Sequence, residues 1–160
     1  MRLRGLVEED FTNYKKPSMF LIVPFCTFKC DKEYGTQICQ NLQVTKEPIV
    51  EISNEDIYKR YVENPITKAF VFGGLEPFYE DTFEELYDFI NFLRWDMNCF
   101  DDVVIYTGYD ADECIEEWSR LSKYSNVIVK FGRYIPNQKP HFDDLLGVNL
   151  SSDNQYAEEL

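Results

Sequence analysis

The sequence has no apolar run that approaches the roughly 20 residues of a membrane-spanning helix, which excludes such a helix. Its first residues, MRLRGLVEEDF, carry acidic side chains where a signal peptide needs its apolar core. From these two absences we expect a cytoplasmic protein with no membrane partner.

Basic residues are also scarce. The chain has 16 Lys and Arg against 29 Asp and Glu, which gives a net charge of −13. Nucleic-acid binding depends on attraction between basic side chains and phosphates, and no basic stripe with interleaved aromatics offsets this charge. Nucleic acid is therefore not an expected partner. The charge has two interpretations: simple solubility, or a fit to a basic face on a protein partner.

Cysteine is present in an odd number, five, so complete internal pairing is impossible. In a chain without an export signal, a disulfide framework is also not expected. Cys26, Cys30 and Cys39 cluster within a short segment, which indicates a metal or cluster site. Cys99 and Cys114 stand apart in helical contexts, and we interpret both as small buried hydrophobes.

Hydrophobic residues make up 44% of the 160-residue chain and aromatics 16%, which excludes a disordered protein and fits one domain, residues 1–160. Apolar runs and helical periodicity alternate along it, which predicts an α/β fold with parallel strands. Strands are predicted at residues 19–23, 48–52, 69–72, 103–106 and 127–131. Helices are predicted at residues 53–63, 81–98 and 110–124. Residues 136–160 have weak periodicity, and we expect an irregular C-terminal wrap.

Distinctive segments follow four of these strands: residues 26–39, 73–77, 107–109 and 132–134. Parallel α/β sheets and barrels carry their sites at the carboxyl ends of the strands. The sequence therefore predicts that all four segments meet at one edge of the sheet.

The cysteine segment reads C-T-F-K-C-D-K-E-Y-G-T-Q-I-C. Three thiolates can hold three irons of a [4Fe–4S] cubane and leave the fourth iron open for a substrate, whereas electron-transfer clusters usually have four cysteine ligands. A closed zinc site is the alternative, with His141, the only histidine, as the fourth ligand of Cys26, Cys30 and Cys39. The spacing alone does not separate the two.

A second motif, F-G-G-L-E-P, follows the strand at residues 69–72. Gly73 and Gly74 let the backbone approach a ligand closely, and Glu76 can form a charged hydrogen bond with an amino group. Taken alone, the motif also fits an ordinary turn before the next helix.

Together, the cysteine triplet and the Gly-Gly-x-Glu-Pro segment resemble the radical S-adenosylmethionine (SAM) superfamily. Further stretches resemble one of its families, the activating proteins of anaerobic ribonucleoside-triphosphate reductase. They read G-G-L-E-P-F, V-V-I-Y-T-G-Y, V-K-F-G-R-Y-I and L-G-V-N-L-S-S-D-N-Q. The likeness runs from about residue 19 to residue 155. The Cys30–Cys39 gap is wider than is usual in that superfamily, so the extra residues must loop out, and Leu75 is an insertion in the glycine motif.

The resemblance implies a small partial (β/α) barrel of radical SAM type. It implies that a [4Fe–4S] cluster binds SAM and that one electron then yields methionine and a 5′-deoxyadenosyl radical. In this family the radical takes a hydrogen atom from a glycine of a partner, the anaerobic ribonucleotide reductase. A flavodoxin- or ferredoxin-like protein is the implied electron donor.

The resemblance also implies roles for individual residues. Cys26, Cys30 and Cys39 would be the iron ligands. Phe28 and Ile38, beside the thiolates, would pack against the cluster or the adenine, and Gly73, Gly74 and Glu76 would hold the amino group of SAM. Thr107, Gly108 and Tyr109 would lie at the ribose or methionine portion, with an ordinary strand-end turn as the alternative. Lys130 and Arg133 would meet the SAM carboxylate or the partner, with solvated charges as the alternative. Asn154 and Gln155 resemble the C-terminal Asn-Gln of the family and would close the pocket edge.

Chain length adds a separate argument about the substrate. About four to six strands cannot close an eight-stranded barrel, so one side should stay open to a macromolecule. Two alternatives remain open at this point. One is a radical SAM enzyme for a small molecule, similar to the deazapurine carboxylate synthases, and the other is a non-catalytic Cys3His zinc adaptor.

Overall fold

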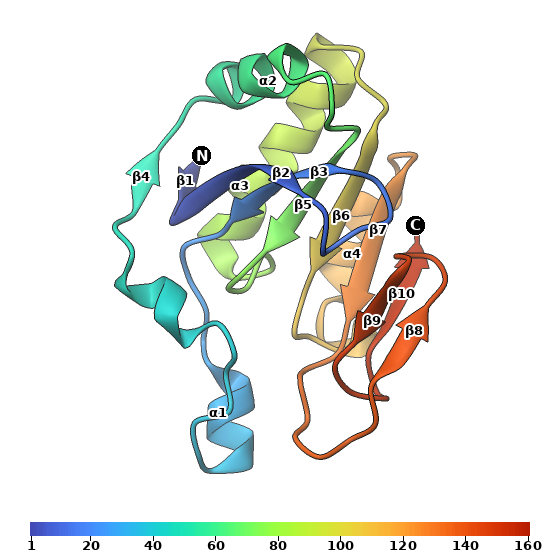
Figure 1. Ribbon diagram of the computed structural model, residues 1–160. Coiled ribbons are helices and arrows are strands. Elements are labelled where there is room, and N and C mark those ends of the chain that lie inside the picture. Colours follow the sequence, from blue (N-terminus) through green and yellow to red (C-terminus); the bar gives the residue numbers. More distant parts are fainter.

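The computed structural model describes residues 1–160 and centres on one six-stranded sheet (Figure 1). The strand order is β10-β7-β6-β5-β3-β2. The four inner strands are parallel, and each outer strand runs antiparallel to its neighbour. The strands are β2 (Gly5–Asp10), β3 (Ser18–Ile22), β5 (Ala69–Gly73), β6 (Asp102–Tyr106), β7 (Val127–Phe131) and β10 (Tyr156–Glu159).

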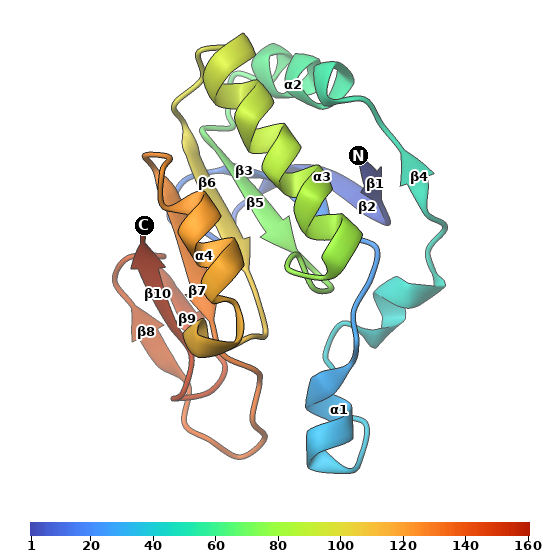
Figure 2. The same cartoon turned by 180° about the vertical axis from the view of Figure 1, so that it is seen from behind.

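The parallel strands follow chain order, each one lying beside the strand before it. With right-handed crossovers, such an order places every connecting helix on the same face of the sheet. Figure 2 shows α3 and α4 across that face, with α2 at one end of the sheet. The helices are α1 (Lys29–Tyr34), α2 (Asn54–Glu63), α3 (Glu80–Asn91) and α4 (Ile115–Leu121). Short helical turns are η1 (Leu42–Lys46), η2 (Phe92–Asp96), which is a π turn, and η3 (Ala111–Glu113).

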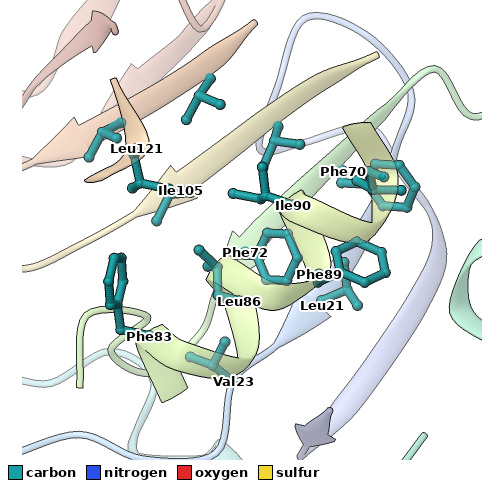
Figure 3. Packing of buried hydrophobic residues seen from close by; sticks show 14 of the residues in the cluster. Leu21, Val23, Phe70, Phe72, Phe83, Leu86, Phe89, Ile90, Ile105 and Leu121 are labelled. Carbon is teal, nitrogen blue, oxygen red and sulfur yellow. The ribbon is translucent and has the colours of Figure 1, made fainter. Parts of the chain in front are cut away.

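The main core lies between this helical face and the sheet. Side chains alternate across each strand, so Leu21, Phe72 and Ile105, which are in register on neighbouring strands, point to the helices (Figure 3). From α3, Phe89 packs edge-on against Phe72 with ring centroids 5.8 Å apart. Each fully buried side chain of this size stabilises the fold by about 1.5–3 kcal/mol, so this face anchors the sheet.

The opposite face of the sheet has a smaller core. Val71, Val104 and Ile128 point to it and pack with Tyr14, Leu146 and Leu150. Two short strands, β8 (His141–Asp143) and β9 (Val148–Leu150), form an antiparallel hairpin there. Strand β9 of this hairpin also lines the pocket described below.

The predicted α/β class, the four inner strands and the helix at residues 53–63 are confirmed. Two helix predictions were too long. The helix at residues 81–98 ends in the π turn, and the helix at residues 110–124 breaks at Cys114, whose backbone is not helical. Of residues 48–52, only β4 (Val50–Glu51) is strand, and it pairs with β1 (Arg2–Leu3) outside the main sheet.

The expectation of an irregular C-terminal wrap is wrong, because β8, β9 and β10 lie in that segment. The N-terminal strand β2 was not predicted either. Both β2 and β10 are outer strands rich in acidic residues, which have low strand propensity. Their strand conformation depends on hydrogen bonding to the neighbouring strands, β3 for β2 and β7 for β10.

The outer strand β10 has a feature of its own at Ala157. The backbone N–H of Ala157 donates to the carboxylate of Asp143 in β8 at 3.2 Å. The adjacent residues Glu158 and Glu159 are exposed. No helix of the chain combines the length and apolar character that crossing a membrane requires.

Candidate functional site

A pocket of about 460 Å³ lies at the carboxyl ends of the inner strands. All four distinctive segments contribute to it, so the structure brings them together as the sequence predicted. The sequence-predicted site residues that line it are Cys26, Cys30, Cys39, Gly74, Glu76, Thr107, Gly108, Tyr109 and Lys130. Phe28, Ile38 and Gly73 do not line it.

The three cysteines of the pocket are free thiols, and each is partly buried. The Cys26 sulfur accepts the backbone N–H of Phe28 at 3.2 Å. Burial, together with the nearby Glu76, Cys30 and Cys39, raises the pKa of Cys26 to about 11. Burial and the neighbouring Cys39 also raise the pKa of Cys30. A cation placed beside these thiols would favour their thiolate forms.

The wide gap between Cys30 and Cys39 is accommodated by a local fold. The helix α1 extends through the gap and ends at Gly35, whose φ of 72° is left-handed. The chain then returns, and Asp31 accepts the backbone N–H groups of Ile38 and Cys39 at 2.8 Å each. The extra residues thus loop out as expected, and Asp31 draws Cys39 back beside Cys30.

Two residues flanking the thiols are placed differently from the expectation. Phe28 has a left-handed backbone, with φ of 52°, and packs against the main core. Ile38 is held by its N–H bond to Asp31 and stays outside the pocket lining. A position beside a cysteine in sequence does not fix the direction of the side chain, and here the turn geometry directs both away from the pocket.

The two glycines of the Gly-Gly pair differ in what they do. A Cβ on Gly74 would lie 2.6 Å from Cγ2 of Ile22, and the φ of 85° is left-handed, so only glycine fits. Gly73 ends β5, and its carbonyl accepts the N–H of Val23 at 3.0 Å. Gly73 therefore serves the sheet, and Gly74 alone brings its backbone to the pocket.

Glu76 is buried, with 4% of its surface exposed, and connects two strand ends. One carboxylate oxygen, Oε1, accepts the Thr107 hydroxyl at 2.6 Å and the Phe78 N–H at 3.0 Å. The other, Oε2, accepts the Gly108 N–H at 2.9 Å. Burial raises the pKa of Glu76, while these hydrogen bonds and the nearby Lys130 oppose the rise. A carboxylate oxygen takes two hydrogen bonds, so Oε2 keeps one acceptor position.

Lys130 is the buried cation of the pocket. It lies in β7 with 6% of its surface exposed, and its ammonium donates to the Gly132 carbonyl at 2.6 Å. Burial lowers its pKa to about 8, although Glu76 and Asp110 act in the opposite direction. An ammonium has three N–H donors, so two remain for a ligand.

The segment after β6 forms a wall between these two charges. The Thr107 hydroxyl accepts the Tyr109 N–H at 3.0 Å while it donates to Glu76. The Tyr109 carbonyl accepts the N–H of Gly132 at 2.9 Å. The ends of β5, β6 and β7 are thus cross-linked by hydrogen bonds, which fixes the shape of the pocket without any ligand.

Asn154 and Gln155, the candidates at the pocket edge, form hydrogen bonds mainly with backbone groups. Gln155 lines the pocket, accepts the N–H groups of Ser151 and Ser152, and donates to Gly132. Asn154 donates to the Arg133 carbonyl at 2.9 Å and stays outside the lining. Sequence reasoning missed part of the lining, which comes from the turn after β2, from strand faces and from β9: Thr12, Asn13, Phe20, Ile22, Tyr106, Val148, Asn149 and Leu150. The strict alternation of side chains along β3 and β6 was the one signal for Phe20, Ile22 and Tyr106.

The two metal chemistries raised by the sequence place different demands on this site. His141 lies in β8 and is not part of the pocket lining. No three His, Cys, Asp or Glu side chains are arranged to share a single metal ion. A cubane cluster attaches its cysteines to separate irons, so its sulfurs lie farther apart than ligands of one ion. His141 is not placed in the pocket with the three cysteines, as the closed Cys3His site would require.

The arrangement has a clear chemical capacity. The pocket lining combines three soft thiol donors with a carboxylate that has one free acceptor position and an ammonium that has two free donors. Such a pair can hold both ends of an amino acid, ammonium to Glu76 and carboxylate to Lys130. No protein-family model, no curated protein and no solved structure matches this chain.

Proposed function

We propose that this chain binds a [4Fe–4S] cluster through Cys26, Cys30 and Cys39 and cleaves SAM reductively to generate a glycyl radical on a partner anaerobic ribonucleotide reductase. The observation that carries the proposal is the shared pocket, which three free thiols line together with Glu76 and Lys130. Three ligands leave one corner of a cubane open, and the charged pair supplies what the amino-acid end of SAM needs.

In this proposal the residues of the pocket bind and orient SAM. Lys130 directs its two free N–H groups to the carboxylate, and Glu76 Oε2 accepts from the ammonium. When bound, the cluster supplies the electron that breaks the S–C5′ bond of SAM and gives methionine and a 5′-deoxyadenosyl radical. Gly74 and Gly108 keep the pocket wall free of side-chain bulk, and Phe20 and Ile22 line it with apolar surface that excludes water.

The open edges of the sheet favour a macromolecular substrate in this proposal. The strand order begins at β2 and ends at β10, and these two strands do not pair with each other. A sheet that is not closed, with helices on one face, fits a partial barrel of radical SAM type. A partial barrel leaves a side through which the glycine of a folded partner can reach the radical.

The first test is anaerobic reconstitution with iron and sulfide. We expect a brown, oxygen-sensitive protein with about four irons and four sulfides per chain. Addition of SAM and dithionite should release 5′-deoxyadenosine. Cys30→Ser should abolish both results, whereas Cys99→Ser, at a half-buried cysteine outside the pocket, should abolish neither. A fully reconstituted protein that releases no 5′-deoxyadenosine would refute the proposal.

The second test concerns the substrate. Cleavage of SAM alone does not separate a glycyl-radical activase from an enzyme that acts on a small molecule. The reaction is therefore repeated in the presence of a purified anaerobic ribonucleotide reductase, and the glycyl radical is measured by electron paramagnetic resonance. A radical signal that requires both proteins and SAM supports the activase. Turnover without such a signal assigns the pocket to a small-molecule substrate.

A further inference from the structure

The helix that carries Cys30 is held to the body in an unusual way. None of the residues of α1 is buried, and the helix projects from the sheet in Figure 1. No side chain within α1 is buried in the core, and the hydrophobic contact at this end of the segment comes from Phe28, the residue before the helix. Nevertheless, the position of α1 decides where Cys30 stands relative to Cys26, which follows directly after β3.

Charged side chains form the contacts between α1 and the body. At the start of the helix, the Lys29 ammonium pairs with Glu113 Oε1. One turn later, Glu33 Oε2 lies 3.4 Å from Nε of Arg133. Arg133 in turn pairs with Glu113 Oε2 at 2.5 Å. Lys29 and Glu33 also face each other along the helix at 3.7 Å, so the four residues, Lys29, Glu33, Glu113 and Arg133, close into a charged ring.

The two members of the ring on the body are firmly placed. Arg133 follows the end of β7, its side chain is only 11% exposed, and its guanidinium lies over the ring of Tyr109 at 5.9 Å. It also pairs with Asp110 at 3.5 Å. Glu113 belongs to η3 and completes a capping box with Asp110. Arg133 thus belongs to a strand-end segment that lines the pocket and Glu113 to the turn η3 after β6, whereas Lys29 and Glu33 belong to the cysteine segment.

Glu113 keeps its charge over the whole working range of pH. Partial burial raises its pKa, but hydrogen bonds from Lys29, the Asp110 backbone and Arg133 outweigh burial and hold the pKa at about 2. The charge of Glu113 is therefore kept at pH values well below neutral, and salt screens its ion pairs because they remain partly exposed.

We propose that the charged ring is the device that positions the cysteine segment over the pocket, with Arg133 and Glu113 as positioning residues for Cys30 and Cys39. The placement of the thiols stands on the ring geometry alone. Its consequence for cluster assembly rests on the proposed function. Loss of the ring removes the ion pairs between α1 and the body, so the thiols become more accessible and a cluster that needs all of them at once assembles poorly.

The test uses the metal-free protein. Iodoacetamide alkylation is followed cysteine by cysteine by mass spectrometry in wild type and in Arg133→Gln. Removing three partly exposed ion pairs should raise the alkylation rates of Cys30 and Cys39 about three- to tenfold. Raising NaCl from about 0.05 M to about 1 M should do the same in wild type, because the Debye length shrinks to about 3 Å. Cys114, which is 1% exposed, reports that the core is intact and should not change.

Three variants make the result specific. Arg120→Gln is the matched control. Arg120 in α4 donates two hydrogen bonds, of 2.6 and 2.8 Å, to the carboxylate of Glu84 in α3, and this ion pair lies away from the cysteines. Arg133→Lys keeps the charge and should restore slow alkylation in part, whereas a purely steric role would not be rescued by it. Lys29→Gln removes a ring member from the half-exposed side of α1, which avoids any risk to the core.

The outcomes separate this inference from the proposed function. Equal alkylation rates in wild type, Arg133→Gln and Lys29→Gln would overturn the ring as a positioning device. Faster alkylation in both variants but not in Arg120→Gln would establish it. Iron content after reconstitution is then compared in the same set. If wild type binds no iron while the alkylation pattern holds, the proposed cluster fails and the positioning role stands.

Discussion

Replacing Glu76 by Gln tests whether this carboxylate shapes the pocket before any ligand binds. In the structure its two oxygens accept three hydrogen bonds, from Thr107, Phe78 and Gly108. Two of these donors are backbone N–H groups at the ends of different loops. A Gln side chain has one carbonyl oxygen and one NH2 group, so one backbone N–H must face the NH2 whichever way the amide is turned.

The magnitude follows from that mismatch. An unsatisfied buried donor costs about 1–3 kcal/mol, and replacing charge-assisted bonds by neutral ones costs about 1 kcal/mol more. We therefore expect the free energy of unfolding of the metal-free protein to fall by about 2–4 kcal/mol. For a chain of this length each kcal/mol lowers the melting temperature by about 2–4 °C, which predicts a drop of roughly 5–15 °C.

The assay is urea and thermal denaturation followed by circular dichroism, without iron or SAM. Glu116→Gln is the control, because Glu116 is an exposed carboxylate of α4 with no hydrogen-bond partner, and it should shift the melting temperature by less than about 2 °C. If Glu76→Gln proved as stable as Glu116→Gln, the strand-end cross-link would be refuted. Glu76 would then have to be understood through a ligand alone.

Three further predictions follow from neighbouring residues. Below pH 8, Lys130 is charged in both the folded and the unfolded protein. Burial lowers its pKa in the folded protein to about 8, so the folded protein loses this proton at a lower pH than the unfolded chain does. The free energy of unfolding of wild type, measured by urea titration relative to Lys130→Met, should therefore rise by up to about 3 kcal/mol between about pH 8 and 10.5. A difference between the two proteins that does not change with pH would contradict this prediction. Gly74→Ala should lower the free energy of unfolding by about 2–4 kcal/mol, because the added Cβ meets Ile22. Gly35→Ala is the control, since Gly35 has a similar φ of 72° but no atom near its added Cβ, and it should lower the free energy of unfolding by about 1 kcal/mol. Equal losses in the two variants would exclude the clash with Ile22. Asp31→Ala should speed hydrogen exchange of the Ile38 and Cys39 amides several-fold with little change in melting temperature, and unchanged exchange would show that Asp31 does not hold the return loop.

The inner part of the fold could be predicted because its strands are continuous apolar runs. Residues such as Phe70 and Val129 are buried on the sheet whatever covers them, and this leaves a clear pattern in the sequence. The outer strands leave no such pattern. Glu8 in β2 and Glu158 in β10 face solvent, and their strand conformation depends on pairing with β3 and β7, which lie elsewhere in the sequence.

The site divides in a similar way. Residues that directly follow a parallel strand, such as Glu76 and Thr107, were located correctly because the strand ends must meet. Residues whose direction depends on local turns were not. Phe28 points into the core because its backbone is left-handed, and Asn149 reaches the pocket only through the β8–β9 hairpin. No spacing rule in the sequence encodes those directions.

The contact between Asp143 and the N–H of Ala157 has a consequence for how the molecule meets its own copies. A bare outer strand offers its amides to any extended peptide, and this is how sheets recruit foreign strands and aggregate. Here one of those amides is already occupied, and two copies approaching along this border would bring Glu158 and Glu159 against the same charges. Addition of a further strand beside β10 is therefore disfavoured.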